Sequence, residues 1–313
     1  MNGPVGRFAP TPSGYLHAGN LVCALLAWLS VRSRNGRFLL RIEDLDLPRC
    51  TPEYTQQCIE DLRLLGLDWD GPILYQSQRT QVYEEHLQQL TDLGLTYPCF
   101  CTRAMLHTLS APNLGDTQYI YPGTCANLSP AEVQALSALR NPAIRFRVPD
   151  RTIAFHDLVQ GEYAENPARD CGDFVLRRSD GLFGYQLAVV VDDAFSGVTE
   201  VVRGRDILSS TPRQICLYEA LGHPIPVYAH IPLMTDAQGR RLAKRDQDIR
   251  LASLSRRYSV PWILGMLGYA CGLLPELGPV HLWDLIPLFS WERIRSSGSF
   301  RLVMPGQSDA IHD

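Results

Sequence analysis

The feature that most constrains this chain is an apolar run that leads, through one turn, directly into a helix. Residues 5–9 predict a short buried strand, and the Pro- and Gly-containing segment 10–17 predicts a turn. Apolar residues then recur at helical spacing, at Leu21, Ala24, Leu25 and Trp28. A second strand is expected at 37–42. Strand–helix–strand order favours a parallel α/β sheet, and a glycine turn that opens the helix is where such sheets bind phosphate groups.

The rest of the chain continues this pattern with one interruption. Thr51 and Pro52 form a helix start, as N-cap and first helical residue, and further helices are expected at 79–93 and from Thr211. Strands are expected at 143–148, 198–203 and 227–235. We interpret 97–150 as an insertion between two halves of one sheet domain, at 1–96 and 151–235. The predicted last part, 236–313, holds a loop, a small helical subdomain and, after Ser296, a poorly ordered tail.

Charge and hydropathy narrow the functional classes. The net charge of −4 and the pI near 6.1 give no general attraction to nucleic acid, so any RNA contact must come from local Arg clusters. Two such clusters are Arg240, Arg241 and Arg245, and Arg250, Arg256 and Arg257. No segment approaches the ~20 apolar residues of a membrane helix, and the N-terminus lacks the layout of a signal peptide. We therefore expect a cytoplasmic monomer with no membrane partner.

Lysine usage singles out one position. Of the 29 basic residues, 28 are arginine, and Lys244 is the one lysine. Broad use of arginine indicates a coding bias, so we interpret the exception as a position where arginine would not serve, and chance is the alternative. A lysine ammonium is a compact charge on a mobile stem, which suits a migrating phosphate group. Lys244 follows a predicted hairpin turn at 236–239.

Several strings along the chain resemble, in order, the motifs of the glutamyl-tRNA synthetase family of class I synthetases. The first is Arg-Phe-Ala-Pro-Thr-Pro-Ser-Gly-Tyr-Leu-His-Ala-Gly-Asn at 7–20, and the others lie at 41–46, 185–193, 197–206 and 210–214. The two class signatures correspond to His17-Ala18-Gly19-Asn20 and Arg241-Leu242-Ala243-Lys244-Arg245. Asn20, Arg241 and Ala243 depart from the strict class pattern. The resemblance covers roughly residues 6–250.

This resemblance implies a fold and a reaction. The fold is an α/β, Rossmann-type nucleotide-binding fold of class I synthetases with a zinc-binding insertion. The reaction joins L-glutamate to ATP, with Mg²⁺, to give glutamyl-AMP and pyrophosphate, through positioning and stabilisation of phosphate charge. The implied ATP site and catalytic groups are His17, Gly19, Asn20 and Lys244. The implied glutamate site is Arg7, Phe8, Ala9, Pro10, Thr11, Glu43, Tyr185 and Arg203.

Roles within the glutamate site follow from charge. Arg7 is the candidate for the side-chain carboxylate, through a bidentate fork, with Arg203 and Tyr185 assisting. Glu43 is the candidate for the α-ammonium group. For each residue taken alone, an ordinary structural ion pair is the competing interpretation.

Three cysteines in the insertion suggest a metal site. Cys99, Cys101 and Cys125 would supply three thiolates to a tetrahedral zinc ion. The Cys-x-Cys pair and its loose spacing to Cys125 are weak signals by themselves. The short paralogue of glutamyl-tRNA synthetase carries a similar zinc motif that ends in Tyr-x-x-x-Cys, which implies Tyr121 as fourth ligand, with His107 as the fallback. The alternative is three unrelated thiols.

About sixty residues follow Arg250, too few for an anticodon-reading domain of ordinary size. This and the cysteine motif favour the glutamyl-queuosine tRNA(Asp) synthetases, the short paralogues that attach glutamate to queuosine in the anticodon loop of tRNA(Asp). A truncated glutamyl-tRNA synthetase and a glutamyl adenylate donor to another acceptor remain as enzyme alternatives. A glutamate- or nucleotide-sensing paralogue is the non-enzyme alternative.

Overall fold

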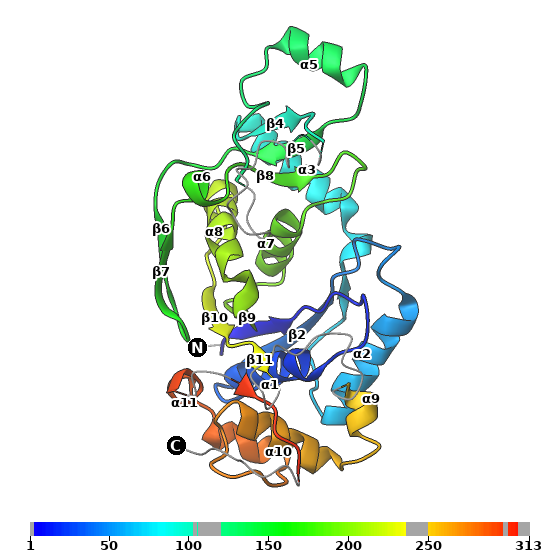
Figure 1. Ribbon diagram of the computed structural model, residues 1–313, viewed down its shortest axis with the longest axis vertical. Coiled ribbons are helices and arrows are strands. Elements are labelled where there is room, and N and C mark those ends of the chain that lie inside the picture. The colour runs from blue at the N-terminus through cyan, green and yellow to red at the C-terminus, as the bar shows by residue number, and fades with distance from the viewer. Residues whose placement is uncertain (1–2, 103–104, 106–119, 236–249, 297–299, 306–313) are drawn as a thin grey trace.

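A mostly parallel sheet runs through the centre of the molecule, as a computed structural model shows for residues 3–102, 105, 120–235, 250–296 and 300–305 (Figure 1). Within these residues the sheet has seven strands in the order β3-β2-β1-β9-β10-β6-β7. The first six are parallel, and β7 pairs antiparallel with β6. The strands are β1 Val5–Phe8, β2 Arg37–Ile42, β3 Leu74–Tyr75, β6 Ile153–Asp157, β7 Gly161–Glu165, β9 Glu200–Gly204 and β10 Val227–Ile231.

Local signals set the ends of the first helices. Helix α1 (Ala18–Arg32) begins at His17, whose side chain accepts from the N–H of Gly19, and Asn20 completes a capping box. Helix α2 (Pro52–Leu65) has Thr51 as N-cap and ends at Gly66, in the left-handed region with φ 78°. The expected strand at 37–42 and the expected start of α2 are thus confirmed.

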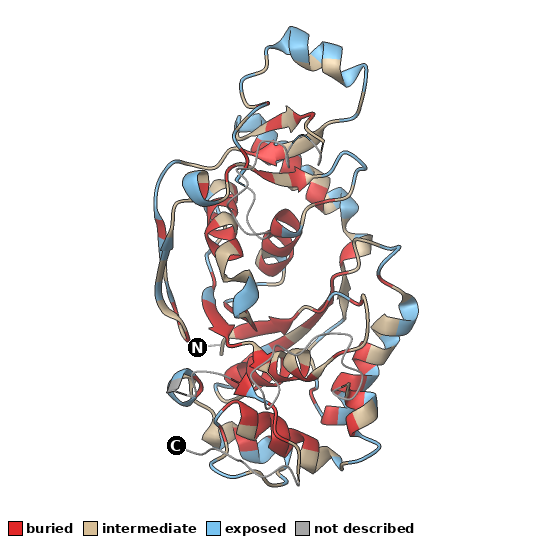
Figure 2. Ribbon diagram, viewed as in Figure 1, coloured by how far each residue is buried: buried red, intermediate tan, exposed pale blue. Residues whose placement is uncertain are grey.

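Helices cover both faces of the sheet. Helices α1 and α10 (Val260–Ala270) share one apolar core, which includes Phe38 and Leu40 of β2. On the other face, α3 (Thr80–Asp92), α7 (Tyr185–Phe195) and α8 (Thr211–Leu221) form a second core around Tyr83 and Tyr218. Figure 2 shows the buried residues concentrated in the sheet and on the helix faces that contact it. Since α10 packs on α1, the expected C-terminal helices share the core of the sheet domain.

The insertion forms a small antiparallel sheet at one end of the molecule (Figure 1). Its strands are β4 (Thr96–Cys99), β5 (Ala143–Phe146) and β8 (Phe174–Arg177). A short helix, α5 (Pro130–Ser137), projects beyond it and begins with a capping box at Ser129. Because β8 lies after residue 150, the small sheet does not end where the predicted insertion ends. Between β5 and β8 the chain returns to the main sheet as the β6–β7 hairpin.

The remaining short elements connect these layers. They are η1 (Gln76–Gln78), α6 (Pro167–Asp170), η2 (Arg205–Ser210), β11 (Met234–Thr235), α9 (Leu251–Leu254), η4 (Leu282–Leu288), α11 (Trp291–Ser296) and β12 (Phe300–Arg301). In the part of the chain that the structure describes, no helix is long and apolar enough to cross a bilayer.

The expectation of a poorly ordered tail directly after Ser296 is wrong for residues 300–305. Strand β12 pairs with β11, and Phe300 is fully buried in the core that contains α1 and α10. Leu302 donates its N–H to the carbonyl of Thr235. The apolar alternation Phe-x-Leu at 300–302 is typical of a strand, but it is too short to predict one among the polar residues that precede it.

We predict that Phe300→Ala lowers the free energy of unfolding by about 3–5 kcal/mol, because it removes a fully buried aromatic ring. Arg301→Ala, an exposed neighbour on the same strand, should change it by less than about 0.5 kcal/mol. Urea denaturation followed by circular dichroism measures both. Equal midpoints for the Phe300 variant and the unmodified protein would show that β12 contributes nothing to the core.

Candidate active site

A cavity of about 760 Å³ opens at the carboxyl ends of β1, β9 and β10, beside the first turn of α1. It is lined by every residue that the sequence analysis assigned to glutamate: Arg7, Phe8, Ala9, Pro10, Thr11, Glu43, Tyr185 and Arg203. His17, Gly19 and Asn20 line the same cavity. The topology explains the convergence, since the carboxyl ends of neighbouring parallel strands meet at one edge of a sheet.

A buried ion cluster lies next to the cavity and includes two of its lining residues, Arg7 and Glu43. Nε of Arg7 lies 3.2 Å from Oδ1 of Asp193 on α7, and Nη1 of Arg41 on β2 lies 2.5 Å from the same oxygen. Nη2 of Arg41 also lies 3.1 Å from Oε1 of Glu43. All four side chains are at least nine-tenths buried. Burial alone would raise the pKa of Asp193, but the Arg41 and Arg7 guanidinium groups hold it below its ordinary value.

The cluster leaves Arg7 with donors to spare. An arginine has five N–H groups. The Nε–H of Arg7 goes to Asp193 and one Nη1–H goes to the carbonyl of Val202, at 3.3 Å, so that three of the five have no partner in the described residues. These three N–H groups are enough for a bidentate contact with a carboxylate, which is the role predicted for Arg7.

Glu43 lines the same cavity and is about nine-tenths buried. Burial raises the pKa of its carboxyl group, although Arg41 and Arg7 act in the opposite direction. Its negative form, which an ammonium ligand requires, is therefore lost at a higher pH than for an ordinary glutamate. An ammonium group that bound beside Glu43 would lower this pKa and favour the negative form, as the predicted contact with the α-ammonium group requires.

Arg203 is held from four directions. Its Nε contacts Nε2 of His230 at 2.9 Å, and its Nη atoms contact Gln214, Thr211 and, more weakly, the hydroxyl of Tyr185 at 3.5 Å. Of its five N–H groups, these four contacts leave one for a ligand. Arg7 and Arg203 thus differ in what they offer: Arg7 can bind a carboxylate with a fork, whereas Arg203 adds a single hydrogen bond.

The first turn of α1 presents a phosphate-binding geometry. Nδ1 of His17 accepts the N–H of Gly19 at 3.1 Å, so the neutral ring carries its proton on Nε2. A Cβ atom at Gly19 would lie only 3.0 Å from the His17 ring, so a larger residue there would force the ring to shift. The side-chain oxygen of Asn20 accepts the N–H of His17 at 3.2 Å. Asn20 was assigned to the ATP site, and its side-chain oxygen is used to cap the helix.

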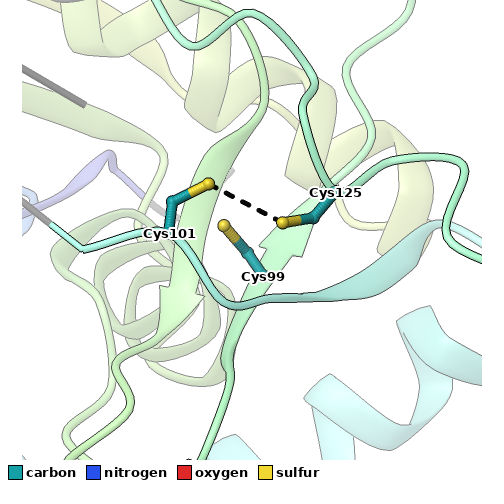
Figure 3. A group of neighbouring side chains, drawn as sticks. All are labelled: Cys99, Cys101 and Cys125. Atoms are coloured by element: carbon teal, nitrogen blue, oxygen red, sulfur yellow. Dashed lines mark hydrogen bonds between the residues drawn. The ribbon is translucent and has the colours of Figure 1, made fainter. Parts of the chain in front are cut away.

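The three cysteines of the insertion converge (Figure 3). The sulfur atoms of Cys99, Cys101 and Cys125 lie within 4.8 Å of one another, and those of Cys101 and Cys125 are 3.7 Å apart. The hydroxyl of Tyr121 lies 3.5 Å from the sulfur of Cys99 and accepts the N–H of Cys125 at 2.9 Å. In a tetrahedral zinc site with Zn–S distances of ≈ 2.3 Å, the ligand atoms are about 3.8 Å apart. The three sulfur atoms therefore lie close enough together to hold a zinc ion, and the Tyr121 hydroxyl lies at ligand spacing from one of them, the sulfur of Cys99.

Sequence reasoning missed the residues that hold the site residues in place. Asp193 lies inside a recognised motif, but its partners Arg7 and Arg41 are more than 150 residues away. Asp157 and His230, which support Arg203, are 73 residues apart. Cys23 also lines the cavity, and burial raises its pKa to about 12. Lys244, the rest of the lysine loop, the hairpin turn at 236–239 and His107 lie outside the described residues.

Comparison with known proteins agrees with this geometry. Residues 5–258 match the family model of class I tRNA synthetases (E and Q), catalytic domain. A glutamyl-Q tRNA(Asp) synthetase of Symbiobacterium thermophilum is 48% identical over 302 residues, which cover 92% of this chain and 93% of that protein. One of Nitratidesulfovibrio vulgaris is 47% identical over 298 residues, 91% of each chain. A glutamate tRNA ligase of Elizabethkingia meningosepticum, solved with its amino acid, aligns with a TM-score of 0.83 at 27% identity, over 96% of this chain and 67% of that one.

The parallel sheet, the capped first turn of α1 and the cavity at the strand ends define the catalytic domain of a class I tRNA synthetase. The predicted α/β fold of class I synthetases is confirmed, and zinc binding by the insertion stays a prediction. Within that class, the chain belongs to the family of glutamyl-Q tRNA(Asp) synthetases.

We predict that Arg7→Ala raises the KM for glutamate roughly 10- to 150-fold, the equivalent of about 1.5–3 kcal/mol for lost hydrogen bonds to a charged group. It should also relax discrimination against glutamine, because the charged partner of the side-chain carboxylate is gone. Glutamate- and glutamine-dependent ATP–pyrophosphate exchange measures both effects. Arg205→Ala, an exposed arginine just beyond the strand end of Arg203, is the matched control. If glutamine stays excluded in the Arg7 variant, Arg7 is not the selector.

Proposed function

We propose that this protein activates L-glutamate with ATP and transfers it to queuosine in the anticodon loop of tRNA(Asp). The observation that carries the proposal is the placement of Arg7 and Glu43 on one cavity beside the first turn of α1. One group fits a carboxylate, the other an ammonium, and the helix N-terminus fits a phosphate. The relatives named above are glutamyl-Q tRNA(Asp) synthetases, which supports the same acceptor here.

In the activation step, the residues act by position and charge. Arg7 binds the side-chain carboxylate and Glu43 binds the α-ammonium group, so that the α-carboxylate points toward the first turn of α1. The Nε2–H of His17 donates to a phosphate oxygen, and Lys244 and Mg²⁺ balance the charge of the departing pyrophosphate. The α-carboxylate oxygen bonds to the α-phosphorus of ATP while the bond to pyrophosphate breaks. No protein nucleophile is needed.

In the transfer step, a hydroxyl of the queuosine cyclopentene ring attacks the carbonyl carbon of glutamyl-AMP. An ester forms, AMP leaves, and the hydroxyl proton is lost. A base in an RNA loop can leave its stack and enter such a pocket, unlike a paired base. The Arg residues of the lysine loop and Arg250, Arg256 and Arg257 would bind loop phosphates in spite of the net charge of −4.

The cysteine cluster fits a structural zinc ion held by Cys99, Cys101, Cys125 and Tyr121. When bound, the ion would hold the end of β4 against the loop that carries Cys125. The cluster belongs to the small sheet of the insertion, while the glutamate cavity lies at the strand ends of the main sheet. Its effect on catalysis is therefore indirect.

The acceptor can be tested with the isolated anticodon stem-loop of tRNA(Asp). With queuosine in the loop it should accept labelled glutamate, and with guanine in that position it should not, because the attacking hydroxyl is absent. The measurement is acid-precipitable label, with the full tRNA as positive control. Label on the 3′-terminal adenosine of tRNA(Glu) would instead favour the activity of a glutamyl-tRNA synthetase, and exchange without any RNA product would favour another acceptor.

The metal can be tested without activity. We predict about one zinc ion per chain by elemental analysis, and three fewer titratable thiols before chelation than after it. Cys101→Ser should lower the zinc content, whereas Cys271→Ser, a buried thiol far from the cluster along the chain, should not. Metal-free protein with all thiols open to titration would reject the site.

A further inference from the structure

Arg203 is fixed by a histidine that belongs to none of the recognised motifs. Its Nε lies 2.9 Å from Nε2 of His230 on the neighbouring strand β10. Nδ1 of His230 lies 2.6 Å from Oδ2 of Asp157, at the end of β6. His230 and Asp157 are fully buried. Three adjacent strands, β6, β10 and β9, therefore carry one line of hydrogen bonds that ends at the cavity.

The chemistry of the donors fixes the state of the histidine. An arginine N–H can only donate, so Nε2 of His230 must accept, and the ring proton must sit on Nδ1. Asp157 accepts a hydrogen bond from this Nδ1–H. It also accepts hydrogen bonds from the backbone N–H groups of His230, Val159 and Gln160, at 2.9–3.1 Å. The carboxylate thus has a single orientation, which in turn selects the tautomer of His230.

We propose that Asp157 and His230 form a positioning pair that holds the guanidinium group of Arg203 toward the side-chain carboxylate of the substrate. Glutamate binding then requires the neutral, Nδ1-protonated form of His230. The proposal rests on the proposed function, since it gives Arg203 a glutamate ligand. It also predicts the tautomer of His230, which can be measured without any activity.

Protonation of His230 would place an N–H opposite the Nε–H of Arg203. The groups around the ring come from every neighbouring element: Asp157 on β6, Arg203 on β9, Thr211 on α8 at 3.2 Å, the stacked ring of Tyr228 on β10, and the charge of Arg7 on β1. Burial, with the two arginines, lowers the pKa of His230 below its ordinary value, although Asp157 opposes this. The pair is therefore intact at neutral pH and is lost only as the pH falls through the lowered pKa.

Two substitutions separate positioning from simple support of the fold. In His230→Gln, the side-chain oxygen lies near the position of Nε2 and can still accept from Arg203. In His230→Asn, the amide lies near the position of Nδ1, so that the contact with Asp157 survives and the contact with Arg203 is lost. We expect the KM for glutamate to rise about tenfold or more in the Asn variant, with kcat less affected, and about threefold or less in the Gln variant.

The pH profile gives a second readout. Glu43 and the substrate also titrate at acid pH, so the informative quantity is the difference between the unmodified protein and His230→Gln. The Gln variant, which cannot titrate, should lose part of the rise in KM at low pH. His156→Gln is the matched control, because that ring lies on the adjacent strand β6, is 54% exposed and has a hydrogen bond only to Glu162 among the described residues. Its profile should equal that of the unmodified protein.

Nitrogen NMR of ¹⁵N-histidine-labelled protein tests the pair directly. At pH 7 the His230 signals should show a protonated Nδ1 and an unprotonated Nε2. A proton on Nε2, or a KM in His230→Asn equal to that of His156→Gln, would overturn the proposal. If the unmodified protein forms no glutamyl adenylate, the proposed function fails, and the NMR result alone then decides whether the pair is built as described.

Discussion

The buried ion cluster of Arg7, Arg41, Asp193 and Glu43 is the interaction on which the rest of the site depends. It joins β1, β2 and α7, and its longest link spans 186 residues of chain. Buried charges are tolerated only when they are paired with good geometry, and removing one partner leaves the others uncompensated. The cluster therefore fixes how the two halves of the sheet domain meet. It also aims Arg7, because the N–H groups that Asp193 and Val202 do not use are the ones left for a ligand.

Arg203, the second arginine of the cavity, is fixed in the same way as Arg7 but by a different kind of partner. Arg7 and Arg203 each commit Nε to an acceptor on another element, which fixes the plane of the guanidinium group. For Arg7 the acceptor is a carboxylate, which offsets much of its charge. For Arg203 the acceptor is the neutral imidazole of His230, and the Asp157 carboxylate lies on the far side of that ring. Arg203 thus keeps more of its positive field and offers fewer hydrogen bonds, while Arg7 offers more hydrogen bonds and a weaker field.

The elements that sequence reasoning predicted were those with local signals. The Thr51 cap and the strand at 37–42 each depend on residues close in the chain, and each is confirmed. No helix was expected at 185–195, where Val189, Val190 and Val191 favour a strand, yet packing between the sheet and α8 makes it helical. Apart from Lys244, which lies outside the described residues, the predicted glutamate and ATP residues all line the cavity. Their supports, Asp157 and His230, could not be predicted, because their role exists only once β6 lies beside β10.

Arginine and lysine are not interchangeable in this architecture, which gives the one-lysine composition a physical meaning. Arg7 and Arg203 each use one nitrogen to fix the side chain and others for the cavity. A lysine has a single nitrogen on a flexible stem and could not do both. A group that must follow the pyrophosphate as it departs has the opposite requirement, since a fixed plane would hold it back. Lys244 lies outside the described residues, so its role stays a prediction, but the two arginines show why the chain would keep a lysine where a charge has to move.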